Sequence, residues 1–111
     1  MTIDALPTPQ VGVDEVTQFR REGYVVIPGV LPAAQVEACK VALSDLMQER
    51  IPRRSTNLYY EAGQSVEGLS PEQRELKVRR LDSFCDDHPV LAAAANARRL
   101  HAVLDQLCGI G

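Results

Sequence analysis

The hydrophobic and polar positions of residues 19–50 predict a helix end, a short strand, a turn and a long helix. Gly23 is expected where the first helix stops, because a residue without a Cβ adopts the left-handed cap conformation at no steric cost. The run from Tyr24 to Ile27 is apolar throughout and β-branched or aromatic, which is typical of a strand covered on both faces. Pro28 and Gly29 then end that strand.

The long helix is predicted to begin near Pro32, which can occupy a first turn because its missing N–H is not needed there. Apolar residues then recur at three- and four-residue spacing and form one stripe, made of Val36, Cys39, Leu43, Leu46 and Met47. Ordering the backbone of such a helix costs about as much free energy as burial of its apolar stripe contributes. The stripe is therefore expected to pack against a sheet.

Shorter elements are expected on either side. Asp14 is a candidate N-cap for a helix through Glu22. Asn57 to Tyr60 has the composition of a second short strand. Ser70-Pro71-Glu72-Gln73 is a capping-box sequence that starts a short helix, and the local pattern alone would continue this helix through Lys77 to Asp82.

The C-terminal third is predicted to be helical. Asp86 and Asp87 are candidate caps for a helix through Ala95, and Asn96 allows a break before the next helix. Gly109 occupies the expected C-terminal cap position of that last helix. Its apolar stripe is made of Leu100, Val103, Leu104 and Leu107.

Composition limits the class of protein. A chain of 111 residues with a net charge of −3 and scattered arginine pairs does not offer the clustered positive charge that binds nucleic acid. Its three cysteines lack C-x-x-C spacing, which argues against a disulfide framework or a zinc knuckle and fits a reducing cytoplasm. We find no signal peptide and no apolar stretch of about eighteen residues, so neither secretion nor a membrane partner is expected. Residues 1–13 are expected to be a flexible leader, and residues 14–111 to form one domain or part of one.

Three stretches together resemble a known family. The run F-R-R-E-G-Y-V-V-I-P-G-V-L, then L-K-V-R-R-L-D-S-F with D-D-H-P-V-L, then R-R-L-H-A-V-L-D-Q-L-C-G, occur in order between Val16 and Gly109. They resemble the N-terminal portion of the phytanoyl-CoA dioxygenase (PhyH) family of non-haem iron, 2-oxoglutarate-dependent oxygenases. The resemblance implies an α+β fold, mainly helical with short strands, that flanks a double-stranded β-helix (jelly roll) missing from this sequence. It also favours a strand at Lys77 to Asp82.

The resemblance implies Fe(II) and 2-oxoglutarate as cofactors of the intact enzyme. The family holds iron by a His-x-Asp motif and a distant His, whereas this chain has only His88 and His101, and neither begins such a motif. No metal ligand and no catalytic residue is therefore expected here, and the sequence stops before the family's active site. The chain alone is expected to bind neither cofactor. The substrate is a small molecule that the sequence does not identify, and both hydroxylation and halogenation stay open.

Other site residues are implied as well. The family places a basic side chain just before the Ser-Phe step to hold 2-oxoglutarate, and Arg80 is the best match, with Arg79 and Lys77 as alternates. An arginine suits a carboxylate because its planar fork donates two parallel hydrogen bonds. Tyr59 and Tyr60 are candidates for the substrate mouth. A solvated charge on a strand edge and ordinary surface packing are the competing interpretations of these positions.

Two functions follow. In the first, the chain is the N-terminal part of a PhyH-like dioxygenase that hydroxylates a small molecule and is inactive as an isolated chain. In the second, it is a self-contained small α/β binding or interaction module, as a monomer or as a dimer. Because the few short strands expected here cannot close a barrel, we also expect exposed apolar surface and self-association.

Overall fold

The computed structural model describes residues 7–109, which form helices and a two-stranded antiparallel sheet. The predicted α+β class is therefore confirmed. The chain divides into two compact units, of which unit 1 holds the residues up to Val36 and from Ala94 onward, and unit 2 holds Glu37 to Ala93. In the described part of the chain, no helix is both long enough and apolar enough to cross a membrane.

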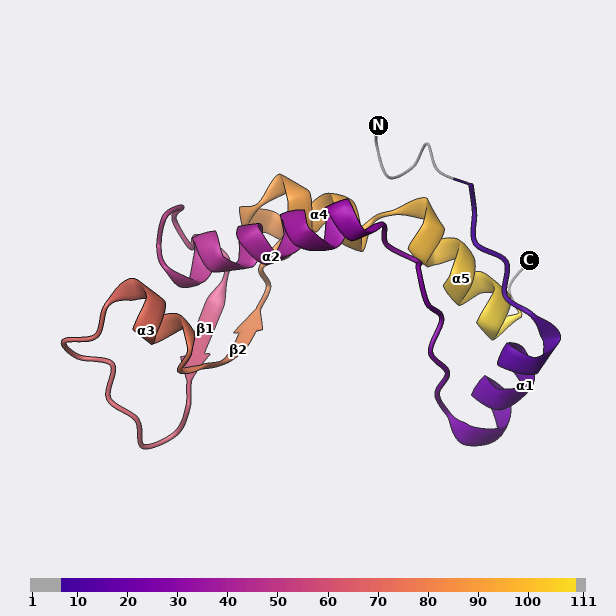
Figure 1. Cartoon of the computed structure of the whole chain (residues 1–111), viewed down its shortest axis with the longest axis horizontal. Coiled ribbons are helices and arrows are strands. Elements are labelled where there is room, and N and C mark those ends of the chain that lie inside the picture. Colours follow the sequence, from indigo (N-terminus) through magenta and orange to yellow (C-terminus); the bar gives the residue numbers. More distant parts are fainter. Residues whose placement is uncertain (1–6, 110–111) are drawn as a thin grey trace. The chain divides into compact units, whose positions relative to one another are not determined.

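Unit 1 pairs helix α1 (Val13–Glu22) with helix α5 (Arg98–Cys108), which lie beside each other (Figure 1). α1 ends as predicted at Gly23, whose φ is 84° and whose N–H donates to the carbonyl of Phe19 at 2.9 Å. Its N-cap is Gly12, and no side chain caps this end. The prediction of Asp14 as cap is wrong, since Asp14 lies inside the first turn. Its negative charge there still stabilises the helix by interacting with the positive end of the helix dipole.

Helix α5 matches the prediction at its ends and partly along its stripe. The preceding helix α4 (Pro89–Ala95) stops before Asn96, and Gly109 caps α5 with a φ of 73°. Val103 and Leu107 are buried as expected. Leu104 is 50% exposed, so the buried face of α5 is narrower than the apolar spacing predicted.

Two side chains of α5 hold the segment from Pro7 to Gly12. Gln106 accepts from the N–H of Val11 at 3.0 Å and donates to the carbonyl of Pro9 at 3.0 Å. Arg99 donates to the carbonyl of Pro7. Residues 7–12 thus have hydrogen-bonded backbone although they form neither helix nor strand, and the first six residues of the expected leader lie outside the described part.

The turn after residues 24–27 is also held by Arg99. Its guanidinium donates to the carbonyls of Gly29 at 3.1 Å and Val30 at 2.8 Å. The strand predicted at Tyr24 to Ile27 is not formed. A strand requires a hydrogen-bonded partner, and among the described residues the only sheet pairs two other segments. Tyr24 and Val26 are accordingly 61% and 76% exposed.

The core of unit 2 lies between helix α2 (Ala33–Met47) and α4, and consists of Ala42, Leu46 and Leu91. The predicted stripe is confirmed at Leu46, and at Cys39 and Leu43, which are partly buried against this core. Ala42 was not predicted. α2 begins one residue after Pro32, whose carbonyl accepts the N–H of Val36 at 3.0 Å.

The sheet of unit 2 pairs strand β1 (Asn57–Tyr60) with strand β2 (Val78–Asp82) (Figure 1). β1 is confirmed where the sequence predicted it. The helix that the local pattern predicts at Lys77 to Asp82 is not formed. The strand that the family resemblance favours there is present as β2. Tyr59 pairs with Arg80 and Tyr60 with Val78, so Arg79 is an extra residue in a bulge.

Helix α3 (Pro71–Glu75) confirms the predicted capping box. The Ser70 hydroxyl accepts from the N–H of Gln73 at 3.2 Å, and the Gln73 side chain accepts from the N–H of Ser70 at 2.9 Å. The helix then stops at Leu76, because the chain turns into β2. Leu76 itself is 82% exposed.

The aspartates expected to cap α4 do not do so. Both lie in a short 3-10 helix, η2 (Cys85–Asp87). The carboxylate of Asp87 instead accepts from the N–H groups of Ser55 and Thr56 and from the Thr56 hydroxyl, at 2.7 to 3.0 Å. The Thr56 hydroxyl is the main cause that lowers the pKa of Asp87 below 3.8. His88 caps α4, since its Nδ1 accepts from the N–H of Val90 at 3.2 Å.

Candidate functional site

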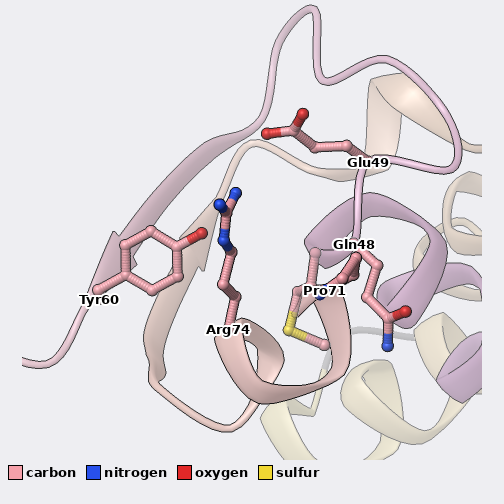
Figure 2. Close-up of a pocket in the computed structure, with 6 residues that line it drawn as sticks. Gln48, Glu49, Tyr60, Pro71 and Arg74 are labelled. Carbon is pink, nitrogen blue, oxygen red and sulfur yellow. The ribbon is translucent and has the colours of Figure 1, made fainter. Parts of the chain in front are cut away.

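The candidate site is a cavity of about 130 Å³ in unit 2 (Figure 2). It lies where the C-terminal end of α2, the last residue of β1 and the start of α3 come together. Its walls are made by Met47, Gln48, Glu49, Tyr60, Pro71 and Arg74.

The end of α2 places Glu49 at the cavity. The N–H of Glu49 donates to the carbonyl of Leu46 at 3.4 Å, and the N–H of Arg50 donates to the carbonyl of Asp45 at 2.9 Å. This pair of bonds is the Schellman motif, which requires a left-handed residue at the position after the helix. Glu49 takes that conformation with a φ of 60°, although glycine is favoured there. The backbone is therefore strained at a residue that lines the cavity.

Arg53 stabilises this helix end and balances its charge. One guanidinium nitrogen donates to the carbonyl of Leu46 at 2.7 Å. The other lies 2.7 Å from the Glu49 carboxylate. Arg53 therefore offsets the negative charge of Glu49 at the rim of the cavity, and both of its terminal nitrogens are engaged.

Contacts between α2 and α3 fix the other wall. The carboxylate of Glu75 accepts from the Ser44 hydroxyl and, at 3.3 Å, from the amide nitrogen of Gln48. The amide oxygen of Gln48 accepts from Arg50 at 2.5 Å. Figure 2 shows this amide directed away from the Tyr60 and Arg74 side chains. Gln48 thus lines the cavity while its polar end is engaged elsewhere.

Arg74 is the residue that gives the cavity its chemistry. Its Nε is buried and has no hydrogen-bond partner. In Figure 2 its guanidinium extends into the space between the Tyr60 hydroxyl and the Glu49 side chain. A buried donor left unpaired costs about 1 to 3 kcal/mol, and more when it is charged. An ordered water or the oxygen of an anion can accept the hydrogen bond that this N–H donates.

The residues that the family resemblance pointed to are separated by the fold. The Arg80 guanidinium lies over the Tyr59 ring, 4.3 Å from its centroid, and its Nε is 3.4 Å from the Asp82 carboxylate. Tyr60 lines the cavity. Thus Tyr59 and Arg80 contact each other at the sheet, whereas Tyr60 lines the cavity that contains Arg74.

The two alternates for Arg80 occupy other positions. Arg79 is the exposed bulge residue, and Lys77 accepts the N–H of Glu61 at 2.8 Å through its carbonyl, next to the sheet. Whether any of these basic residues holds 2-oxoglutarate stays a prediction. Arg74 was missed, because nothing in a capping-box helix distinguishes an arginine that faces a cavity from one that faces solvent.

The histidines do not make the iron site of the resembling family. His88 uses Nδ1 to cap α4, and its Nε2 lies 4.0 Å from the Asp45 carboxylate. Nε2 of His101 is 3.1 Å from the carbonyl of Ala95. Within residues 7–109, no three His, Cys, Asp or Glu side chains are placed to hold a metal ion. In this part of the chain, His88 and His101 are therefore not placed with a carboxylate as a facial triad.

Comparison of the chain with protein-family models, with curated proteins and with solved structures found no match. The function of the chain is therefore inferred from the residues and geometry described above. Two features bear on it: strand β2, and the cavity that contains Arg74.

Proposed function

We propose that the chain is the N-terminal portion of a PhyH-like, Fe(II)- and 2-oxoglutarate-dependent oxygenase. The observation that carries this proposal is strand β2. Local spacing predicts a helix at Lys77 to Asp82, whereas the family resemblance favours a strand there, and a strand forms at Val78–Asp82. This agreement supports the proposal at a position where the local pattern alone predicts a different element.

The segment from Tyr24 to Ile27 supports the same proposal. It is composed of strand-forming residues, yet it lacks a partner among the described residues, and Val26 is 76% exposed. In an intact oxygenase, residues outside this sequence would supply the jelly roll against which such a segment could pair. The exposed apolar side chains would then become buried.

Under this proposal, iron and 2-oxoglutarate, when bound in the intact enzyme, would supply the oxidising chemistry for hydroxylation of a small molecule. The present residues do not supply the iron ligands, so their role is to flank that site. Arg80 is assigned to the 2-oxoglutarate carboxylate, and its contacts with Tyr59 and Asp82 would hold the guanidinium in one orientation. Halogenation remains the alternative reaction of the same enzyme class.

The reading frame after Gly111 tests this proposal. A His-x-Asp motif within several tens of residues, followed by a later His and Arg, is the expected result. In the extended protein, Arg80→Ala should raise the 2-oxoglutarate concentration for half-maximal succinate formation by about tenfold or more, because a charge-assisted hydrogen bond is lost. Arg79→Ala is the matched control and should have a smaller effect. Full activity in both variants would contradict the assignment.

A self-contained α/β binding module is the second candidate. It is favoured by hydrogen bonds that close loops within each unit, such as those from Thr56 to Asp87 and from Arg99 to Val30. Cooperative unfolding of a monomer, together with strong amide-exchange protection in α2, would support this function over the first.

A further inference from the structure

We propose that the cavity formed by Tyr60 and Arg74 binds a small carboxylate, which accepts hydrogen bonds from the Arg74 guanidinium and the Tyr60 hydroxyl. This site goes beyond the proposed oxygenase function, because it lies wholly within unit 2 and does not depend on any iron ligand.

The Arg74 guanidinium has an unpaired donor at the cavity. Nε of Arg74 is buried and lacks a partner, and the guanidinium makes no hydrogen bond or ion pair with any residue between 7 and 109. A carboxylate can bind side-on to an arginine, taking one N–H from Nε and one from the terminal nitrogen beside it. That arrangement uses the donor that the fold leaves unpaired.

Nearby groups favour the same ligand. Figure 2 shows the Tyr60 hydroxyl directed toward the Arg74 guanidinium, where it can donate a further hydrogen bond to the ligand. Glu49 is the one carboxylate among the lining residues, and its charge is offset by Arg53 at 2.7 Å. Arg74 therefore leaves a net positive charge at the cavity, which favours an anion.

The size of the cavity limits the ligand. A cavity of about 150 Å³ in another protein binds benzene, so about 130 Å³ here suits a ligand of similar or smaller size. Met47 and Pro71 contribute apolar wall to the space. A short-chain monocarboxylate, with its anionic end on Arg74, fits both properties. 2-Oxoglutarate has two carboxylates on a longer chain and is not the expected ligand.

Acetate is the probe for the test. The isotope-labelled 111-residue chain is titrated with sodium acetate at constant ionic strength while the N–H resonances of Arg74 and Tyr60 are followed by NMR. We expect saturable shifts in the millimolar range. Acetamide, which has the same shape without the charge, and chloride should shift these resonances little. Shifts that do not saturate, or that are equal for acetamide, would overturn the proposal.

Substitutions locate the site. Arg74→Gln should abolish the saturable shift, and Arg74→Lys should weaken binding about tenfold, since lysine keeps the charge but lacks the fork. Arg54→Gln removes the same charge at an exposed position outside the cavity and is the matched control, with unchanged affinity expected. Acetate binding that survives Arg74→Gln in a variant with a native amide spectrum would refute the assignment.

Two further variants keep the test decisive if Arg74→Gln does not fold. Tyr60→Phe removes one hydroxyl and should weaken acetate binding about threefold to tenfold. Glu49→Gln removes the opposing carboxylate and should tighten binding. An unchanged acetate affinity in both variants would contradict the proposed geometry.

Discussion

The substitution Leu46→Ala tests most directly whether the core of unit 2 is packed around Leu46. Leu46 is fully buried on α2, and its neighbours in the core are Ala42 and Leu91. The half-buried side chains around this core are Cys39, Leu43, Ile51, Phe84 and Val90. Because these neighbours come from α2, from α4 and from the segments that precede β1 and α4, the truncated side chain leaves a space that no single rearrangement fills.

The expected cost can be worked from this environment. Truncating a buried leucine to alanine costs about 2 to 5 kcal/mol, the transfer free energy of the lost atoms plus a cavity term. A chain of 111 residues has a total free energy of unfolding of about 5 to 15 kcal/mol. Leu46 is the one fully buried large side chain among the described residues. The free energy of unfolding of unit 2 should therefore lie near the lower end of this range. A loss of about 3 kcal/mol would lower the melting midpoint by roughly 10 to 20 °C.

Urea unfolding of the purified chain, followed by far-ultraviolet circular dichroism, measures the loss. Leu76→Ala is the matched control, because Leu76 is 82% exposed and the same truncation there should change the free energy of unfolding by less than about 0.5 kcal/mol. Amide exchange in α2 should accelerate only in the Leu46 variant. Equal effects of the two substitutions would refute the assigned core.

Four further outcomes are expected. Thr56 and the backbone of Ser55 lower the pKa of Asp87, so the stability from this carboxylate is present above about pH 4 and is lost as the pH falls through the lower folded-state pKa. Asp87→Asn should therefore reduce the acid dependence of the urea midpoint. Glu49→Gly relieves the strain of a side chain at a φ of 60° and should raise the free energy of unfolding by about 0.5 to 1 kcal/mol. Glu49→Ala keeps a Cβ at this position and should not raise it. A hydrophobic dye should bind the chain, given exposed side chains such as Val26, and light scattering should detect self-association. The isolated chain should form no succinate above a no-protein control, since neither His88 nor His101 begins the His-x-Asp motif that such an iron site uses.

Elements determined by local interactions were predictable from the sequence. The capping box at Ser70 and the glycine caps at Gly23 and Gly109 formed as expected. Each depends on residues within a few positions of one another, so the sequence contains all the information. The same holds for the long helix, although its stripe alone did not identify Ala42 as core.

Elements that depend on distant partners were harder to predict. A strand at Tyr24 to Ile27 has the right composition but lacks a neighbour among the described residues, whereas β2 forms at a helix-like sequence because β1 pairs with it. Asp87 shows the same effect for a side chain. Its position suggested a helix cap, yet three donors at Ser55 and Thr56, more than thirty positions away, take its carboxylate.

The cavity could not be predicted from the sequence, because its chemistry depends on a buried Arg74 N–H that has no hydrogen-bond partner. Several arginines in the described chain find partners: Arg53 caps α2, Arg99 binds a turn, and Arg80 lies over an aromatic ring. A sequence pattern can suggest a partner for an arginine, but it cannot show that one is missing. Only the folded arrangement of α2, β1 and α3 leaves the Nε of Arg74 buried and unpaired. The strained conformation of Glu49 at the same cavity is a second feature invisible in the sequence, and strain of this kind is often found where a protein binds a ligand.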